Sequence, residues 1–171
     1  VHRFDTSKTY TGDNQFISNY RVPKGITFDP EGNLYVSEVA TSNIRKYVGP
    51  GKQKEGSDLG IFAETIPVMG YIYGICNLAS DKQGNIYVAG FETNNIGKFD
   101  KQGKGTIFSA DRKIINPFGI GFDPEGKLYV SCARSGNISR CDDNGKATIV
   151  VKGSEHDLKH PCQCVFTSTL K

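Results

Sequence analysis

The densest group of potential metal ligands lies near the end of the sequence, where His156 and His160 precede Cys162 and Cys164. Imidazole and thiolate groups are ligands of zinc and copper, and the two cysteines would share one face of a strand. The spacing matches no recognised zinc motif. We therefore expect a solvated loop followed by core cysteines and no bound metal, with a zinc or copper site as the alternative.

Four basic residues recur at equivalent places, each two residues after a valine or isoleucine. They are Arg3, Lys46, Lys98 and Arg140. A ring of like charge repeated by fold symmetry can attract an acidic partner or a phosphate backbone. The aliphatic stems of such residues also cover apolar neighbours, and this structural role is our preferred interpretation. The formal net charge of only +3 gives no reason to expect a nucleic-acid partner.

These side chains belong to a segment that occurs three times in the sequence. The first copy reads Asp-Pro-Glu-Gly-Asn-Leu-Tyr-Val-Ser from Asp29, and close variants begin at Asp81 and Asp123. Each copy follows a Gly-Ile pair, which begins at Gly25, Gly74 and Gly119. The copies are spaced by 52 and then 42 residues. Such a period is typical of propellers and other repeat arrays.

Each copy predicts short strands separated by turns. In the first copy, residues 25–28 and 34–37 form apolar strands around a type I turn with Asp29 at its first position and Gly32 at its fourth. A third strand begins at Asn43, and the later copies add a fourth after a second turn. Four antiparallel strands make one blade, and blades stacked around an axis cover both faces of one another. We therefore predict an all-β fold, a β-propeller of four-stranded antiparallel blades.

The two ends of the sequence predict unfinished blades. Residues 1–5 match the third strand at 96–100, and residues 161–166 match the first strand at 117–122. The predicted fold therefore has three full blades and a partial blade at both ends. The expected spans are 1–22 (partial), 23–71, 72–115, 116–159 and 160–171 (partial).

Three arrangements would complete such a ring. The chain can be part of a larger propeller, it can close with a second copy or another chain, or it can form four blades with one strand missing. We favour a partial propeller completed by other polypeptide, because an incomplete blade leaves an exposed edge. The first repeat is longer, and Val48 to Gly70 is expected to be a long connection, more simply a tolerated insertion than a binding loop.

The segment from Pro23 through Ser37, followed by Asn43-Ile-Arg-Lys-Tyr47, resembles the NHL-repeat propellers. It is also similar to the gluconolactonase/regucalcin (SMP-30) and strictosidine-synthase-like propellers and to the streptogramin lyases. The resemblance covers nearly the whole chain and implies a propeller fold. These families differ in chemistry, so it says little about function.

The resemblance also implies where a ligand would bind. In gluconolactonase-like enzymes, an Asn or Asp before the glycine of an inner strand helps to hold a divalent metal in the central channel. At that position we place Lys24, Tyr73, Phe118 and Cys162, none of which offers a carboxylate or amide oxygen. We therefore expect no cofactor, with Ca²⁺ or Zn²⁺ as the alternative. The aromatic residues can instead fill the channel or, as in strictosidine-synthase-like relatives, line an apolar site for a small molecule.

Other signals are few. The sequence contains no Gly-x-Ser-x-Gly, no His-Glu-x-x-His and no phosphate-binding loop, so no catalytic nucleophile can be named. Among the five cysteines, free buried thiols are preferred, with a Cys132–Cys141 disulfide as the alternative. No signal peptide and no membrane-spanning stretch are visible. The compartment is open, and a soluble, secreted protein is our working expectation.

The functional expectation is a rigid binding or assembly platform that contacts a protein partner, or a second copy of itself, through exposed edges. The competing expectation is an enzyme, a channel-site hydrolase or lyase acting on a small organic molecule. The missing metal ligands favour the non-enzymatic alternative.

Overall fold

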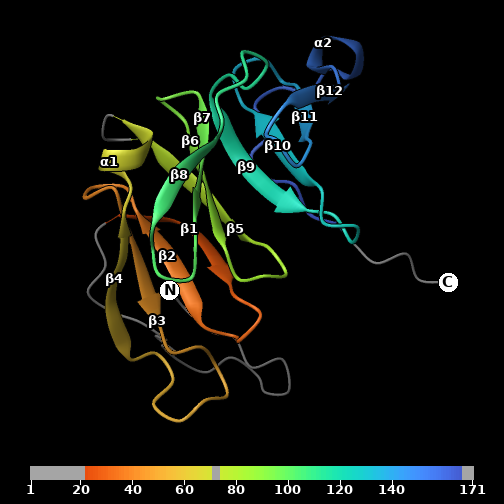
Figure 1. The fold of residues 1–171 in the computed structure, drawn as a ribbon. Coiled ribbons are helices and arrows are strands. Elements are labelled where there is room, and N and C mark those ends of the chain that lie inside the picture. Colours follow the sequence, from red (N-terminus) through yellow and green to blue (C-terminus); the bar gives the residue numbers. More distant parts are fainter. Residues whose placement is uncertain (1–21, 71–73, 167–171) are drawn as a thin grey trace, which may run out of the picture.

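The computed structural model describes residues 22–70 and 74–166, and this part of the chain is almost entirely β. It forms three separate four-stranded antiparallel sheets, each built from consecutive strands (Figure 1). These sheets are called blades 1, 2 and 3 below. This architecture confirms the predicted propeller of four-stranded blades.

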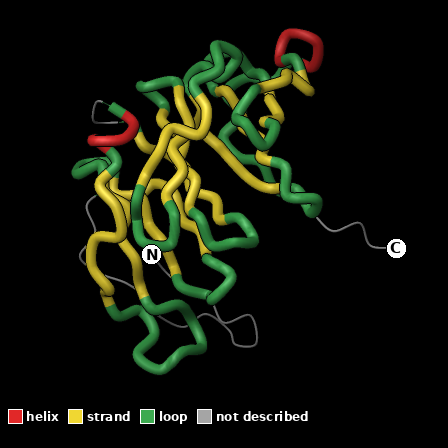
Figure 2. The backbone as a smooth tube through the Cα atoms, viewed as in Figure 1, coloured by secondary structure: helices red, strands yellow, loops and turns green. Residues whose placement is uncertain are grey.

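The strands have the following bounds. Blade 1 contains β1 (Pro23–Phe28), β2 (Leu34–Glu38), β3 (Asn43–Tyr47) and β4 (Asp58–Glu64). Blade 2 contains β5 (Ile75–Ser80), β6 (Ile86–Gly90), β7 (Asn95–Phe99) and β8 (Gly105–Ser109). Blade 3 contains β9 (Pro117–Phe122), β10 (Leu128–Cys132), β11 (Ile138–Cys141) and β12 (Ala147–Val151). Two one-turn helices, α1 (Ile66–Met69) and α2 (Gly153–His156), follow the first and third blades (Figure 2).

The repeated Asp-x-x-Gly segment forms the turn between the first two strands of every blade. In blade 1 the amide of Gly32 donates to the carbonyl of Asp29 at 2.8 Å, and Gly32 has a φ of 77°. This left-handed conformation favours glycine. The Asp29 carboxylate accepts from the backbone amide and the side-chain amide of Asn33, both at 2.8 Å, and from the Tyr35 hydroxyl at 3.1 Å. Turn and second strand are thus tied together by one buried carboxylate.

The core lies between the blades. Tyr35 and Ile44 of blade 1 pack against Ile86, Val88 and Phe99 of blade 2 in one buried cluster. A second cluster joins blade 2 to blade 3, and in it the Tyr87 ring makes edge contacts with Phe108 and Phe122 at centroid distances of 5.1 and 5.0 Å. All residues of β2 and of β6 are buried, because each of these strands is covered on both faces.

The first strands of the three blades lie side by side, with β1 next to β5 and β5 next to β9 (Figure 1). They are the inner strands of the stack. The sheet order from β1 to β4, from β5 to β8 and from β9 to β12 then places β4, β8 and β12 at the outer edges.

Two sequence expectations need correction. The first is the long connection of residues 48–70, which in fact contains β4 and α1, so the first repeat has the same four strands as the others. The pattern was missed because Gly60 interrupts the apolar residues of Asp58–Glu64 and because this strand pairs with β3 through two register shifts. The second is the strand at Pro161–Phe166, which has no strand hydrogen-bonding pattern in the described part of the chain. The expected partial blade at residues 1–22 lies outside the described residues, except for Val22.

Candidate functional site: the bulged ends of the inner strands

Each inner strand contains one extra residue near its start. In β1 the pairing with β2 shifts between Pro23 and Ile26, and in β5 the pairing with β6 shifts in the same way between Ile75 and Leu78. The pairing of β9 shifts opposite Ser131 and Cys132. A bulge redirects side chains and recurs next to binding sites. The bulge is therefore a property of the repeat.

The register shows which residues occupy equivalent positions. Pro23, Ile75 and Pro117 pair with the last residue of the second strand in their blades. The residues that follow them are Lys24, Cys76 and Phe118. The alignment from sequence had placed Tyr73 at this position of blade 2, and the register places Cys76 there instead. Tyr73 itself lies outside the described residues.

Side chains from all three blades meet around this position. The Lys24 ammonium lies 4.7 Å from the centroid of the Phe118 ring and 5.9 Å from that of Phe91. The two rings contact each other edge to face, with centroids 6.1 Å apart. An ammonium group over aromatic faces is stabilised by the ring quadrupoles. Lys24 is exposed, so its charge also faces solvent. Lys24, Phe91, Phe118 and Cys76 are called the channel-mouth cluster below.

The thiol of the channel-mouth cluster is poorly suited to act as a nucleophile. Burial raises the pKa of Cys76, the nearby Lys24 ammonium lowers it in part, and Glu92 raises it again. Cys76 has no exposed surface. Because the thiolate is the reactive form, a buried thiol with a raised pKa is inert at neutral pH. The cluster can accommodate an anionic or aromatic group at Lys24, but it offers no activated nucleophile.

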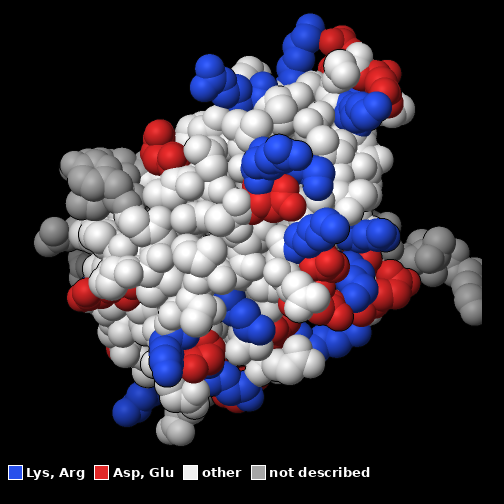
Figure 3. Space-filling view, turned by 45° about the horizontal axis from the view of Figure 1, so that its top comes forward, with Lys and Arg blue, Asp and Glu red and all other residues white. Residues whose placement is uncertain are grey.

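The predicted basic ring is divided among separate surfaces. Lys46 and Lys98 are each half-buried and lie over the tyrosine opposite them, Lys46 at 5.1 Å from the Tyr35 centroid and Lys98 at 5.3 Å from that of Tyr87. Arg140 is exposed opposite Tyr129, and Arg3 lies outside the described residues. Figure 3 shows Lys and Arg side chains interspersed with Asp and Glu on one face of the molecule. The arrangement fits a role in covering the tyrosines.

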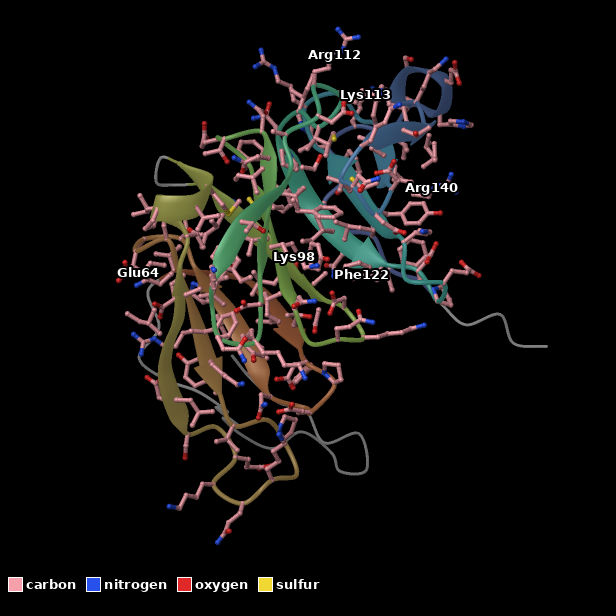
Figure 4. The ribbon with its side chains drawn as sticks, viewed as in Figure 1. Glu64, Lys98, Arg112, Lys113, Phe122 and Arg140 are labelled. Atoms are coloured by element: carbon pink, nitrogen blue, oxygen red, sulfur yellow. The ribbon has the colours of Figure 1, made fainter. Side chains whose placement is uncertain are left out.

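Two grooves repeat between neighbouring blades. The groove between blades 1 and 2 has a volume of about 260 Å³ and includes Asp29, Tyr35 and Lys46 in its wall. The groove between blades 2 and 3 has a volume of about 310 Å³ and includes the equivalent Tyr87 and Lys98. Lys98 and Phe122 lie close to each other there, from β7 and β9 (Figure 4). Because the same side chains build both grooves, they are features of the repeat.

The histidine and cysteine residues near the end are not brought together as a set of metal ligands in the described part of the chain. Within residues 22–70 and 74–166, no three His, Cys, Asp or Glu side chains are arranged to hold a metal ion. His156, His160 and Cys162 are exposed, and Cys164 is half-buried. All five cysteines are free thiols, and Cys76, Cys132 and Cys141 are buried. The alternative of a Cys132–Cys141 disulfide is therefore wrong, and the preference for buried free thiols holds for these three.

Sequence reasoning missed Phe91 and Cys76 as members of the channel-mouth cluster. Phe91 follows β6 in the loop to β7, and its amide donates to the carbonyl of Gly74 at 2.6 Å. The position after the second strand is Val39 in blade 1 and Ala133 in blade 3, so nothing in the repeat marked an aromatic residue there. Cys76 was missed because the Gly74-Ile75 pair occurs three residues before Asn77-Leu78, which the register makes equivalent to Gly25-Ile26.

Comparison with known proteins supports the fold. The sequence matches no family model and no curated protein. Among solved structures it is similar to virginiamycin B lyase from Staphylococcus aureus with quinupristin, with 18% identity, a TM-score of 0.64 and 86% of this chain covered. A streptogramin B lyase structure gives 19% identity, a TM-score of 0.58 and 82% coverage. A chain in the crystal structure of a nidogen/laminin complex gives 19% identity, a TM-score of 0.67 and 84% coverage.

This chain spans about half the length of those structures, with 46%, 43% and 52% of them covered. At such low sequence identity the similarity shows the fold, which is that of a β-propeller. The membership in the NHL-type families stays a prediction. Within the described residues, no helix has the length and apolar character needed to cross a bilayer.

Proposed function

We propose that this chain is a propeller module that serves as an assembly platform and associates with further polypeptide through the outer face of blade 3. This face carries Tyr129, Ile138 and Val150, which with Val165 and Phe166 line a groove of about 310 Å³. The side chains of Val150, Val165 and Phe166 are 43%, 75% and 37% exposed. None of the described residues that line the groove is charged. An apolar surface of this kind is typical of an interaction site.

The single observation that carries the proposal is that the same face is buried in the other two blades. Tyr35 and Tyr87, which are equivalent to Tyr129, are 1% and 5% exposed because the next blade covers them. Blade 3 lacks this cover among the described residues, apart from the segment Pro161–Phe166. Burial of an apolar face is the main driving force for association. The nidogen/laminin complex shows that a structure of this fold can occur in a protein–protein complex.

The solution mass of the 171-residue chain tests the proposal. We expect native mass spectrometry and light scattering to show self-association that increases with protein concentration. Val150→Lys on blade 3 should raise the dissociation constant of self-association at least tenfold, because the substitution places a charged side chain in the apolar groove. Ile107→Lys on the outer strand of blade 2, where the side chain is 40% exposed, is the matched control. A wild-type chain that stays monomeric at about 100 µM would overturn the proposal.

The second candidate is a site for a small organic molecule at the channel mouth, as in a hydrolase or lyase. The observation that favours it is the exposed Lys24 ammonium beside the Phe91 and Phe118 rings. Two of the similar structures are lyases, which supports the fold and not the chemistry. Screening of aromatic carboxylates by thermal shift tests it, with Lys24→Met as the comparison. A ligand that stabilises the wild type and not the variant would support this second function.

A further inference from the structure

The segment Pro161–Phe166 occupies the place of the inner strand of a fourth blade. A Cβ added to Gly119 would lie 2.5 Å from the carbonyl oxygen of Cys162, and one added to Gly25 would lie 2.6 Å from that of Cys76. A Cβ added to Gly121 would likewise lie 2.7 Å from the carbonyl oxygen of Cys164. The segment therefore lies along β9 as β5 lies along β1.

The ring contacts agree with this placement. Phe166 lies 4.8 Å from Tyr129, measured between ring centroids, and the equivalent Phe122 lies 5.0 Å from Tyr87. In blade 3 the strand β10 pairs with β9 next to Phe122 and fills the space beside Tyr87 with Leu128 and Val130. The equivalent space beside Tyr129 is the groove described above. The position that no described residue fills is thus that of a second strand.

Within residues 22–70 and 74–166, no strand pairs with this segment at the place of a second strand. Among the described residues, Pro161–Phe166 takes part in no backbone–backbone hydrogen bond and no strand pairing. In each finished blade the inner strand is paired with an antiparallel second strand. An extended segment with free amide and carbonyl groups is a template for strand addition.

We infer that the free edge of Cys162–Phe166 binds an antiparallel β-strand. This strand carries branched apolar residues at alternate positions, and their side chains enter the groove of blade 3. This inference rests on the proposed function and names its partner. In blade 3, Leu128 pairs with Phe122 and Val130 pairs with Ile120. By the same register, the incoming strand places a leucine opposite Phe166 and a valine opposite Cys164. The groove lining disfavours charged side chains at the two positions that enter it, and a helix would leave the free edge unpaired.

A peptide with the sequence of residues 29–38, Asp-Pro-Glu-Gly-Asn-Leu-Tyr-Val-Ser-Glu, is the probe. It carries the turn and the second strand of blade 1 and contains no cysteine. The control peptide has Leu34→Asp and Val36→Asp. Binding is measured by fluorescence polarisation of a labelled peptide, and the amides of 162–166 are followed by hydrogen exchange in the full chain.

We expect the probe to bind and to slow exchange at these amides at least tenfold, and the control peptide to do neither. Val150→Lys, checked for unchanged melting, should abolish binding, whereas Ile107→Lys should not. If the chain self-associates but the probe gives no protection, the strand inference is overturned and the proposed function stands. If the chain is monomeric and the probe does not bind, the strand inference and the proposed function are both overturned. Protection at other amides only would also overturn the inference.

Discussion

The α-carbon of Gly119 faces the carbonyl oxygen of Cys162 so closely that a Cβ on this glycine would lie 2.5 Å from the oxygen. The same relationship joins Gly25 to Cys76 between blades 1 and 2, at 2.6 Å. The Ser37 hydroxyl strengthens the inner contact by donating to the Cys76 carbonyl at 2.8 Å. Glycine therefore sets the spacing at the contact between β1 and β5 and at the contact between β9 and the segment Pro161–Phe166.

Alanine at the two glycines should have different consequences. Gly25→Ala pushes β1 away from β5 within a buried interface, and we expect it to destabilise the whole chain by about 2–4 kcal/mol. Gly119→Ala should mainly displace Pro161–Phe166, with a smaller loss of stability and faster proteolysis near Phe166. Urea unfolding measures the loss of stability of each variant, and limited proteolysis measures the rate of cleavage near Phe166. Equal losses of stability in the two variants would contradict this assignment.

The aromatic contacts between blades predict a second difference. Tyr87→Ala removes edge contacts with Phe108 and Phe122 inside the core, and should cost about 3–5 kcal/mol. Tyr129→Ala removes one contact with Phe166 on the outer face and should cost less than about 1.5 kcal/mol. Thermal unfolding of both variants at low protein concentration provides the measurement. A larger loss for the Tyr129 variant would show that the outer face is more ordered than proposed.

The buried turn carboxylate predicts a loss of stability in acid. Burial raises the pKa of Asp29, but hydrogen bonds from Asn33 and Tyr35 and the charge of Lys46 outweigh it, so the pKa lies below the usual 3.8. The unfolded state then binds the proton more readily, and the stability from Asp29 is present above pH 3.8 and lost as the pH falls further.

Asp29→Ala should lower stability at pH 7 by about 1–3 kcal/mol and should reduce the pH dependence between pH 5 and 3, read from urea midpoints. Asp143→Ala is the control, because its side chain is 84% exposed. If the two variants have the same acid profile, the Asp29 carboxylate does not have the assigned role.

The buried thiol of blade 3 predicts a loss of stability in alkali. Burial, followed by the charges of Asp111 and Asp142, raises the pKa of Cys141 from 9.0 to about 12. The thiol ionises more readily in the unfolded chain, so its stabilising contribution is complete below pH 9.0 and falls as the pH rises toward 12. The slope approaches about 1.4 kcal/mol per pH unit for one group.

Urea unfolding at several pH values from 8 to 10 should therefore give a steeper decline for the wild type than for Cys141→Ala. Cys162→Ala removes an exposed thiol and should leave the wild-type slope unchanged. Parallel profiles for wild type and Cys141→Ala would show that Cys141 ionises as easily in the folded chain as in the unfolded one.

The sequence predicted the repeat unit well because its signals are local. Asp29 and Gly32 specify a turn by their own side-chain and backbone preferences, and the structure forms this turn in all three blades. The apolar pattern after each turn predicted strands covered on both faces, and β2 and β6 are fully buried. The equivalence of Lys46, Lys98 and Arg140 follows from the same period, and each lies opposite a tyrosine.

The tertiary structure decided what depends on contacts between blades. The Gly74-Ile75 pair lies three residues before Asn77-Leu78, which the register makes equivalent to Gly25-Ile26, so Cys76 and not Tyr73 occupies the position equivalent to Lys24. Lys24, Phe91 and Phe118 come from three different blades, and no local pattern links them. The sequence alone determined the blade and its repetition, because turn chemistry and strand alternation act over a few residues. Only packing between blades decided the channel-mouth cluster and the open face, because their contacts join residues far apart in the chain.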